Sequence, residues 1–217
     1  MKKQMYLIPV AAALLFIAGC TCQGNRSGQV QAEEPQAEGP QAEEEAVPED
    51  EFVNLEIGGG LYYTFSTACF TLLSAPEINE VETNFALQMN DGDADSSVSF
   101  RVLHHGKGVF DSWSRKDLDE VLEMDISDPF DAPLYQGNDV TLKGETFERL
   151  DPTGKMPGCK MTGTFVYNAG TESEYAEETV MMATVLHYNI ILMRATTVGG
   201  NMERLLGALE GFSVTEE

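Results

Sequence analysis

The sequence has little positive charge. Its 217 residues include 13 lysines and arginines against 36 aspartates and glutamates, a formal net charge of −23 at pH 7. A surface of this sign repels nucleic acid and anionic lipid head groups, which excludes a nucleic-acid-binding function. The charge suits a solvated protein that meets basic partners or cations.

Catalytic motifs are also missing. The four cysteines contain no Cys-x-x-Cys pair, so nothing supports thioredoxin-like redox chemistry. There is no Gly-x-Ser-x-Gly nucleophile elbow. Gly58-Gly59-Gly60 lies between predicted strands rather than at a helix start, and the Gly154-Lys155 pair lacks the spacing of a phosphate-binding loop. We therefore expect no enzymatic activity and no cofactor.

Only three histidines occur, and they do not predict a metal site. His104 and His105 are adjacent in a predicted strand, where neighbouring side chains point to opposite faces. A zinc site needs three or four converging protein ligands. We interpret these two residues and His187 as hydrogen-bonded or surface histidines.

The N-terminus carries a short apolar run. Lys2 and Lys3 precede apolar residues from Met5 to Ala18. Crossing the hydrocarbon core takes about 20 helical residues, so this run is too short to span a membrane and matches the core of a secretory signal. It ends in Ile17-Ala18-Gly19-Cys20, which resembles the bacterial lipobox. The alternative is an ordinary signal peptide with a chance cysteine.

The lipobox resemblance implies a lipoprotein. Residues 1–19 would be an export signal, and Cys20 would become the N-terminus and carry two or three acyl chains such as palmitate. One chain alone would bind a membrane only marginally. Thr21, in place of Asp, resembles the outer-membrane sorting pattern, and leaves open whether the protein faces the periplasm or the outside. Loss of Lys2 and Lys3 leaves 11 basic residues, a formal charge of about −25.

Residues 20–50 are predicted to form a disordered acidic tether. Residues 31–45 repeat as QAEEP-QAEGP-QAEEE, and Arg26 is the one base after Cys20 in this stretch. This composition cannot bury enough apolar surface to offset the entropy of ordering, and charged, proline-spaced linkers stay extended. The alternative is a ligand tail for a basic partner.

Residues 51–217 are predicted to form a single α+β domain, a mostly antiparallel sheet with two helices. Alternating or continuous apolar runs predict strands at residues 53–57, 61–65, 69–73, 83–89, 98–103, 141–149, 160–167, 180–186 and 190–195. The last two are apolar at nearly every position, which predicts the sheet centre, covered on both faces. His187-Tyr188-Asn189 is the predicted turn between them; one long strand is the alternative.

Capping signals predict the two helices. Asp111 or Ser114 can cap a helix through about Met124, with Asp117 completing a loose capping box. Pro129 and Pro133 are expected to end that element and open a long loop. Asn201 caps the second helix, whose apolar residues recur at helical spacing: Met202, Leu205, Leu206, Leu209 and Phe212.

This order of elements resembles the PsbP-like fold, a βαβ sandwich found in an extrinsic photosystem subunit and in small bacterial lipoproteins. The segments that carry the resemblance are Phe70–Pro76, Gly158–Tyr167 and Val180–Ser213. It implies a binding or accessory module rather than an enzyme, although fold alone does not determine function.

Two further sites remain as alternatives. Cys69 and Cys159 would be allowed to form a disulfide in an exported domain, worth about 4–5 kcal/mol in the chain-entropy model, or remain as two buried free thiols. Cys22 stays unpaired. Asp91, Asp93 and Asp95 resemble the start of a calcium loop, but the glycine and the twelfth-position glutamate of that loop are missing. The same residues also fit a hairpin turn.

The leading functional hypothesis is a lipid-anchored, non-enzymatic accessory module that binds another envelope protein. An exposed aromatic patch is the expected partner surface, with Tyr62, Tyr63 and Trp113 as candidates, although core packing explains the same residues. A small-molecule or calcium-binding protein is the second hypothesis, and an envelope hydrolase is the third.

Overall fold

The computed structural model describes residues 52–90, 95–136, 139–150, 157–209 and 213–216. The predicted export signal, lipidated Cys20, Cys22 and the tether lie outside these residues. The elements in chain order are β1 (Phe52–Glu56), β2 (Leu61–Ser66), β3 (Phe70–Leu72), β4 (Glu77–Ile78), β5 (Glu82–Met89), β6 (Asp95–His104), α2 (Arg115–Tyr135), β7 (Val140–Leu150), β8 (Gly158–Tyr167), β9 (Tyr175–Leu186), β10 (Asn189–Val198), α3 (Met202–Leu209) and β11 (Ser213–Glu216).

The strands form two antiparallel sheets. The larger sheet has eight strands in the order β3-β5-β6-β10-β9-β8-β7, with the short β4 also paired to β5. The smaller sheet has the order β1-β2-β11. Every strand pair is antiparallel. The described residues thus confirm the predicted α+β class, a mostly antiparallel sheet with two helices.

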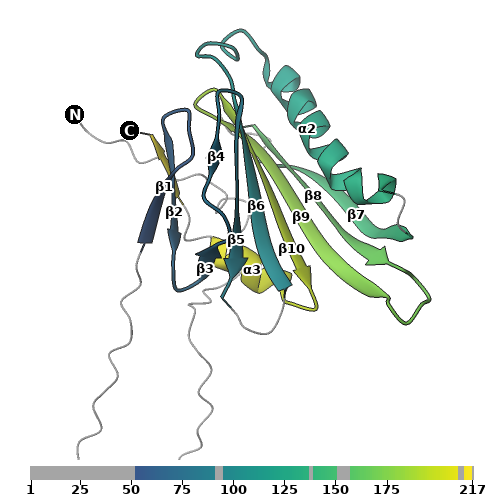
Figure 1. The fold of residues 1–217 in the computed structure, drawn as a ribbon. Coiled ribbons are helices and arrows are strands. Elements are labelled where there is room, and N and C mark those ends of the chain that lie inside the picture. The colour runs from purple at the N-terminus through teal and green to yellow at the C-terminus, as the bar shows by residue number, and fades with distance from the viewer. Residues whose placement is uncertain (1–51, 91–94, 137–138, 151–156, 210–212, 217) are drawn as a thin grey trace, which may run out of the picture.

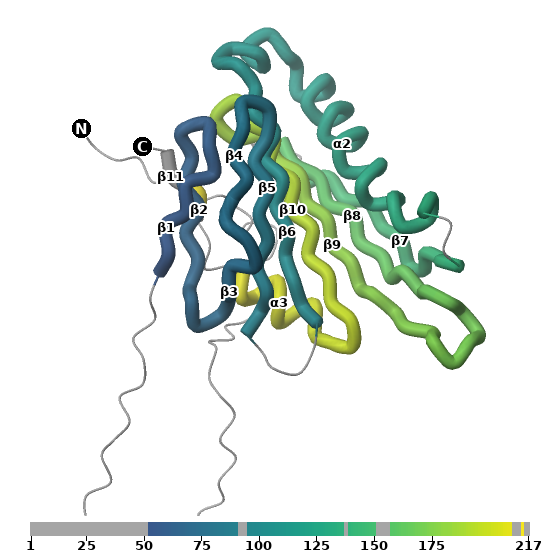
Figure 2. Tube along the Cα trace, in the orientation of Figure 1, coloured from purple at the N-terminus to yellow at the C-terminus, as the bar shows by residue number. Residues whose placement is uncertain are grey.

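The elements are arranged in three layers. Helix α2 lies over β7, β8 and β9 on one face of the large sheet (Figure 1). The small sheet and α3 lie against the opposite face, and the Cα trace shows α2 well away from β1 and β2 (Figure 2). Each sheet face therefore has its own hydrophobic core.

The alternation of side chains along β5 and β6 divides these strands between the two faces. Phe85 and Leu87 of β5, and Val98 and Phe100 of β6, are buried in the core beneath the small sheet. The intervening residues are polar or partly exposed and face the side of α2. Since β5 and β6 lie beyond the reach of α2, these side chains are not covered.

Strands β9 and β10 are buried on both faces, as their continuous apolar sequences predict. Met182 and Met193 belong to the core beneath the small sheet, whereas Met181 and Leu192 belong to the core beneath α2. The two strands form a hairpin at His187 and Tyr188, which both have positive φ angles. This two-residue turn confirms the predicted break between the strands.

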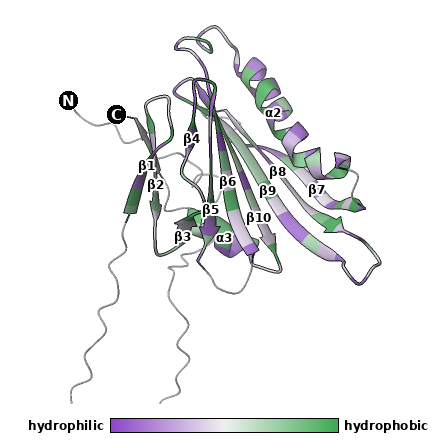
Figure 3. Ribbon diagram, viewed as in Figure 1, coloured by the Kyte–Doolittle hydropathy of each residue, from purple (hydrophilic) through white to green (hydrophobic). Residues whose placement is uncertain are grey.

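Helix α2 begins as predicted but extends further. Ser114 is the N-cap, and its hydroxyl and the Asp117 carboxylate form a reciprocal capping box. The predicted end before Pro129 is wrong, because the helix contains both Pro129 and Pro133 and continues to Tyr135. Hydrophobic and hydrophilic residues alternate along it (Figure 3).

Burial explains why α2 tolerates the two prolines. Each interior proline costs about 3 kcal/mol of helix stability. Leu122, Ile126 and Phe130 are fully buried against β8 and β9 at helical spacing. Burying each of these side chains stabilises the fold by roughly 1.5–3 kcal/mol, which offsets the proline penalty.

The C-terminal segment closes the other core. Asn201 caps α3 by accepting a hydrogen bond at 3.0 Å from the backbone N–H of Arg204, as predicted. Strand β11 then pairs with β2 and places Val214 in the core. Within the described residues, neither helix combines the length and apolar character needed to cross a bilayer.

Candidate ligand-binding groove

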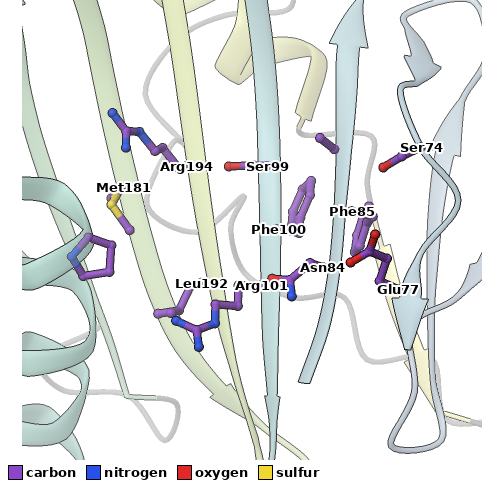
Figure 4. A pocket seen from close by; sticks show the side chains of 12 residues that line it. Ser74, Glu77, Asn84, Phe85, Ser99, Phe100, Arg101, Met181, Leu192 and Arg194 are labelled. Atoms are coloured by element: carbon purple, nitrogen blue, oxygen red, sulfur yellow. The ribbon is translucent and has the colours of Figure 1, made fainter. Parts of the chain in front are cut away.

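A groove of about 440 Å³ lies on the part of the large sheet that α2 leaves open (Figure 4). Its floor consists of cross-strand neighbours from β5, β6, β10 and β9, and its walls are Pro129 of α2 and the segment around β4. The side chains that shape it are Ser74, Glu77, Asn84, Ala86, Ser99, Arg101, Pro129, Met181, Leu192 and Arg194.

Strand register determines which side chains meet on the floor. Ser99 of β6 pairs with Arg194 of β10, and Arg101 pairs with Leu192. The two arginines therefore occupy diagonal positions on one face of adjacent strands. The Cα atoms of such diagonal residues are about 7–8 Å apart. The groove concentrates two guanidinium groups in a strongly acidic protein.

A hydrogen-bonded network holds Arg101 in place. Its Nε donates to Glu82 Oε2 at 2.6 Å, and its Nη2 lies 2.6 Å from the same oxygen. Asn84 Nδ2 donates to the other oxygen of Glu82 at 3.1 Å. The hydrogen bonds from Arg101, and then from Asn84, lower the pKa of Glu82 below its usual value. Glu82 thus stays charged and both of its oxygens are occupied.

Arg194 is held from β9. Its Nη2 donates to Glu177 Oε1 at 3.2 Å, and the Thr179 hydroxyl donates to the same oxygen at 3.1 Å. Neither side chain of the Arg194–Glu177 pair is more than about a quarter exposed, at 26% and 20%. The guanidinium is therefore fixed beside the floor rather than extended into solvent.

Apolar side chains complete the groove. Met181 and Leu192 line the groove but are only 3% and 4% exposed, so almost none of their surface is open to a ligand. The apolar lining residues that are partly exposed are Ala86 of β5 and Pro129 of α2. Charged donors next to apolar surface suit a ligand with both a polar group and an apolar body.

One further carboxylate lies on α2 near this face. Burial raises the pKa of Asp125, and this effect outweighs the electrostatic interactions with His105 and Arg101, which lower it. His105 itself packs edge-on against Phe110, with ring centroids 5.0 Å apart. Asp125 therefore contributes a destabilised negative charge at neutral pH.

A second polar cluster, which we call the His104 clasp, lies at the other end of β6 and consists of Thr83, His104 and Asn189. Thr83 Oγ1 lies 2.9 Å from His104 Nε2, and Asn189 Oδ1 lies 2.9 Å from His104 Nδ1. Its order of hydroxyl, imidazole and amide resembles a nucleophile with a base and an orienting group. Thr83 is completely buried, however, so its hydroxyl is closed to a substrate.

The His104 clasp instead holds the turn between β1 and β2. Gly58 and Gly59 lie so close that an added Cβ would approach His104 Nε2 to 2.8 Å and Asn189 Oδ1 to 2.7 Å. Asn189 also donates to the backbone carbonyl of His187 at 2.8 Å. This confirms the interpretation of His104 as a hydrogen-bonded histidine.

The predicted disulfide between Cys69 and Cys159 is wrong. Cys69 directly precedes β3, whereas Cys159 lies in β8, five strand spacings away in the large sheet. At about 4.8 Å per strand the separation is roughly 24 Å, and a disulfide needs Cα atoms within about 7 Å. Cys159 is a buried free thiol whose pKa is raised to about 12, mainly by burial.

The predicted calcium loop lies mostly outside the described residues. Asp91 and Asp93 are not among them, and Asp95 is exposed at the start of β6. No three His, Cys, Asp or Glu side chains among the described residues could hold a metal ion together. Of the three aromatic residues expected at a partner surface, Tyr63 is buried against Phe100, so its inclusion is wrong. Trp113 packs edge-on against Phe110 and is 38% exposed, and Tyr62 is partly exposed, so for these two residues the partner surface stays a prediction.

Sequence reasoning did not identify Arg101, Arg194 or Asn84. A signal was present, because Arg194 is a charged residue within an otherwise apolar strand sequence. Arg101 and Asn84 stand at the polar positions of alternating strands. Only the pairing of β6 with both β5 and β10 shows that the three share one surface.

Comparison of the chain with protein-family models finds no match, and comparison with curated proteins finds none either.

Proposed function

We propose that this protein is a lipid-anchored, non-enzymatic binding module of the cell envelope and that the groove on the α2 side of the sheet is its binding site. The observation that carries the proposal is the uncovered floor over β5, β6 and β10. There, two arginines held in place by carboxylates share the groove with the partly exposed apolar side chains of Ala86 and Pro129. Such a mixture of fixed polar donors and apolar surface is characteristic of ligand sites.

The anchor belongs to the same proposal. The lipobox at residues 17–20 supports lipidation of Cys20, and the acidic repeat supports a tether that holds the domain away from the membrane. Thr21 favours the outer membrane. Incorporation of labelled palmitate into the native protein, and its loss in Cys20→Ala, would test the anchor. Unchanged labelling in Cys20→Ala would refute it.

We also assign the domain to the PsbP-like class of βαβ sandwiches. The support is the order of its elements: paired strands ending near Pro76, a hairpin, α2, a four-stranded meander, and α3. An accessory role for proteins of this class agrees with a binding function, while the residues of the groove carry the argument itself.

In-cell photocrosslinking tests the binding site. A benzophenone amino acid in place of Ser99 would crosslink to a molecule bound in the groove. The same amino acid in place of the exposed Glu203 on α3 is the matched control. We expect one stoichiometric adduct from position 99 alone, lost when Arg101 and Arg194 are both replaced by Gln. A small mass addition would identify a small ligand, and a protein adduct would identify the envelope partner. Equal labelling at both positions, or none at position 99, would refute the proposal.

A further inference from the structure

The side chains of the groove limit the class of ligand that it can bind. Glu82 and Glu177 are both engaged by arginine, and Glu82 also accepts from Asn84. The arginines retain unused donors, because the described residues give no partner to Nη1 of Arg101 or to Nε and Nη1 of Arg194. The two arginines therefore offer hydrogen-bond donors to a ligand in the groove, beside the hydroxyl of Ser99 and the amide oxygen of Asn84.

The apolar part of the groove lies directly beside these donors. Ser99 of β6 pairs with Arg194 on one side and with the partly exposed Ala86 of β5 on the other. The partly exposed Pro129 of α2 lines the same groove. A ligand that contacts the arginines can therefore also cover apolar surface.

Negative charge at the rim of the groove and in the rest of the chain affects which anions can bind. Glu77 stands at the β4 rim of the groove, on the side away from Met181 (Figure 4). The chain as a whole is strongly acidic, so a small inorganic anion gains little net attraction by approaching it. An anion that also buries apolar surface gains the hydrophobic contribution as well.

We infer that the groove binds a small amphipathic organic anion, with its acidic group between Arg101 and Arg194 and its apolar body on Ala86 and Pro129. This inference rests on the proposed function, since it names the ligand class of the same site. Carboxylates, sulfonates and phosphates share the required chemistry, because each accepts hydrogen bonds from guanidinium groups.

Two fluorescent probes of similar shape test the inference. 8-Anilinonaphthalene-1-sulfonate carries a negative charge, and N-phenyl-1-naphthylamine has the same aromatic body without it. Both are titrated into the mature chain carrying Cys20→Ala. We expect saturable one-site binding of the sulfonate, with the neutral probe at least tenfold weaker.

Three variants locate the binding and its charge dependence. A double variant, Arg101→Gln with Arg194→Gln, should bind the sulfonate at least tenfold more weakly and bind the neutral probe with unchanged affinity. Arg149→Gln is the control, because Arg149 pairs with Glu123 on α2 outside the groove and should change neither probe. Ser99→Trp fills the exposed floor and should abolish binding of both, with Ser99→Leu as a second variant should it not fold. Circular dichroism checks that each variant is folded.

The outcomes separate this inference from the function on which it rests. Equal affinities for the two probes, or a sulfonate affinity independent of the arginines, would overturn the anionic ligand and leave a groove that binds apolar molecules. Absence of sulfonate binding to the unaltered protein would overturn it too. Binding of both probes that survives Ser99→Trp would place them elsewhere and would count against the groove as the binding site.

Discussion

The turn between β1 and β2 offers a matched pair of substitutions, Gly59→Ala and Gly60→Ala. Both glycines have positive φ angles, 61° and 74°, so each alanine carries a similar backbone penalty of about 1–2 kcal/mol. The surroundings differ. An added Cβ at Gly60 meets nothing within 4 Å, whereas at Gly59 it would lie 2.7 Å from Asn189 Oδ1 and 3.1 Å from His104 Nδ1.

The difference between the two variants measures the His104 clasp. Alanine at position 59 would displace Asn189 from His104 and leave a buried polar group unsatisfied, which costs about 1–3 kcal/mol. We therefore expect a loss of unfolding free energy of about 2–5 kcal/mol for Gly59→Ala and about 1–2 kcal/mol for Gly60→Ala. Urea denaturation of the mature Cys20→Ala chain, followed by circular dichroism, provides both values.

Equal losses for the two variants would refute this reasoning, because they would show that the cluster tolerates a methyl group pressed against it. A double variant, Gly59→Ala with Asn189→Ala, adds an internal check. Once the Asn189 amide is absent, Gly59→Ala should cost less than it does in the unaltered chain, since only the backbone penalty and the 3.1 Å approach to His104 Nδ1 remain.

Three further predictions concern other parts of the domain. Ser114→Ala should lower the free energy of unfolding by about 1 kcal/mol through loss of the α2 capping box, and an unchanged urea midpoint would contradict this. Cys159, with its pKa raised to about 12, should react with iodoacetamide at pH 8 only after unfolding; equal mass-spectrometric labelling of native and unfolded protein would contradict its burial. Burial raises the pKa of Asp125, so the folded state binds its proton more tightly and stability falls as pH rises from the unfolded value of 3.8 through the folded one. Asp125→Asn should therefore raise the urea midpoint at pH 7 and have no such effect near pH 3, and a gain of equal size at both pH values would argue against this cause.

The sequence predictions succeed where the interacting residues are close together along the chain. The Ser114–Asp117 capping box, the Asn201 cap and the turn at His187 and Tyr188 depend on residues within a few positions of one another. Such local interactions can be predicted from a single sequence, and these features are confirmed. The nine strands that alternating or apolar runs predict are likewise found, whereas the short β4 and β11 were not predicted.

Helix α2 shows where local rules fail. Proline disfavours a helix interior whatever surrounds it, so the sequence predicted an end before Pro129. The helix continues because Phe130 and Ile126 are buried against β8 and β9, which follow later in the chain. The favourable packing energy comes from partners that periodicity within the helix cannot reveal.

The cysteines and the groove show the same limit of sequence prediction for residues that are far apart along the chain. Compartment and composition allowed a disulfide, but the strand order places β3 and β8 far apart in one sheet. Arg101 and Arg194 are remote in sequence and adjacent in space, because β10 pairs with β6 after the chain has passed through α2 and three further strands.

The sequence by itself determined the kinds of element, their caps and the acidity of the chain, because these depend on residue type and short spacing. The tertiary structure alone decided which face each strand leaves open. Helix α2 covers β7, β8 and β9 but not β5 and β6, and this uneven cover leaves two arginines in an open groove. Strand order, and with it the groove, depends on contacts between distant segments, which no local pattern encodes.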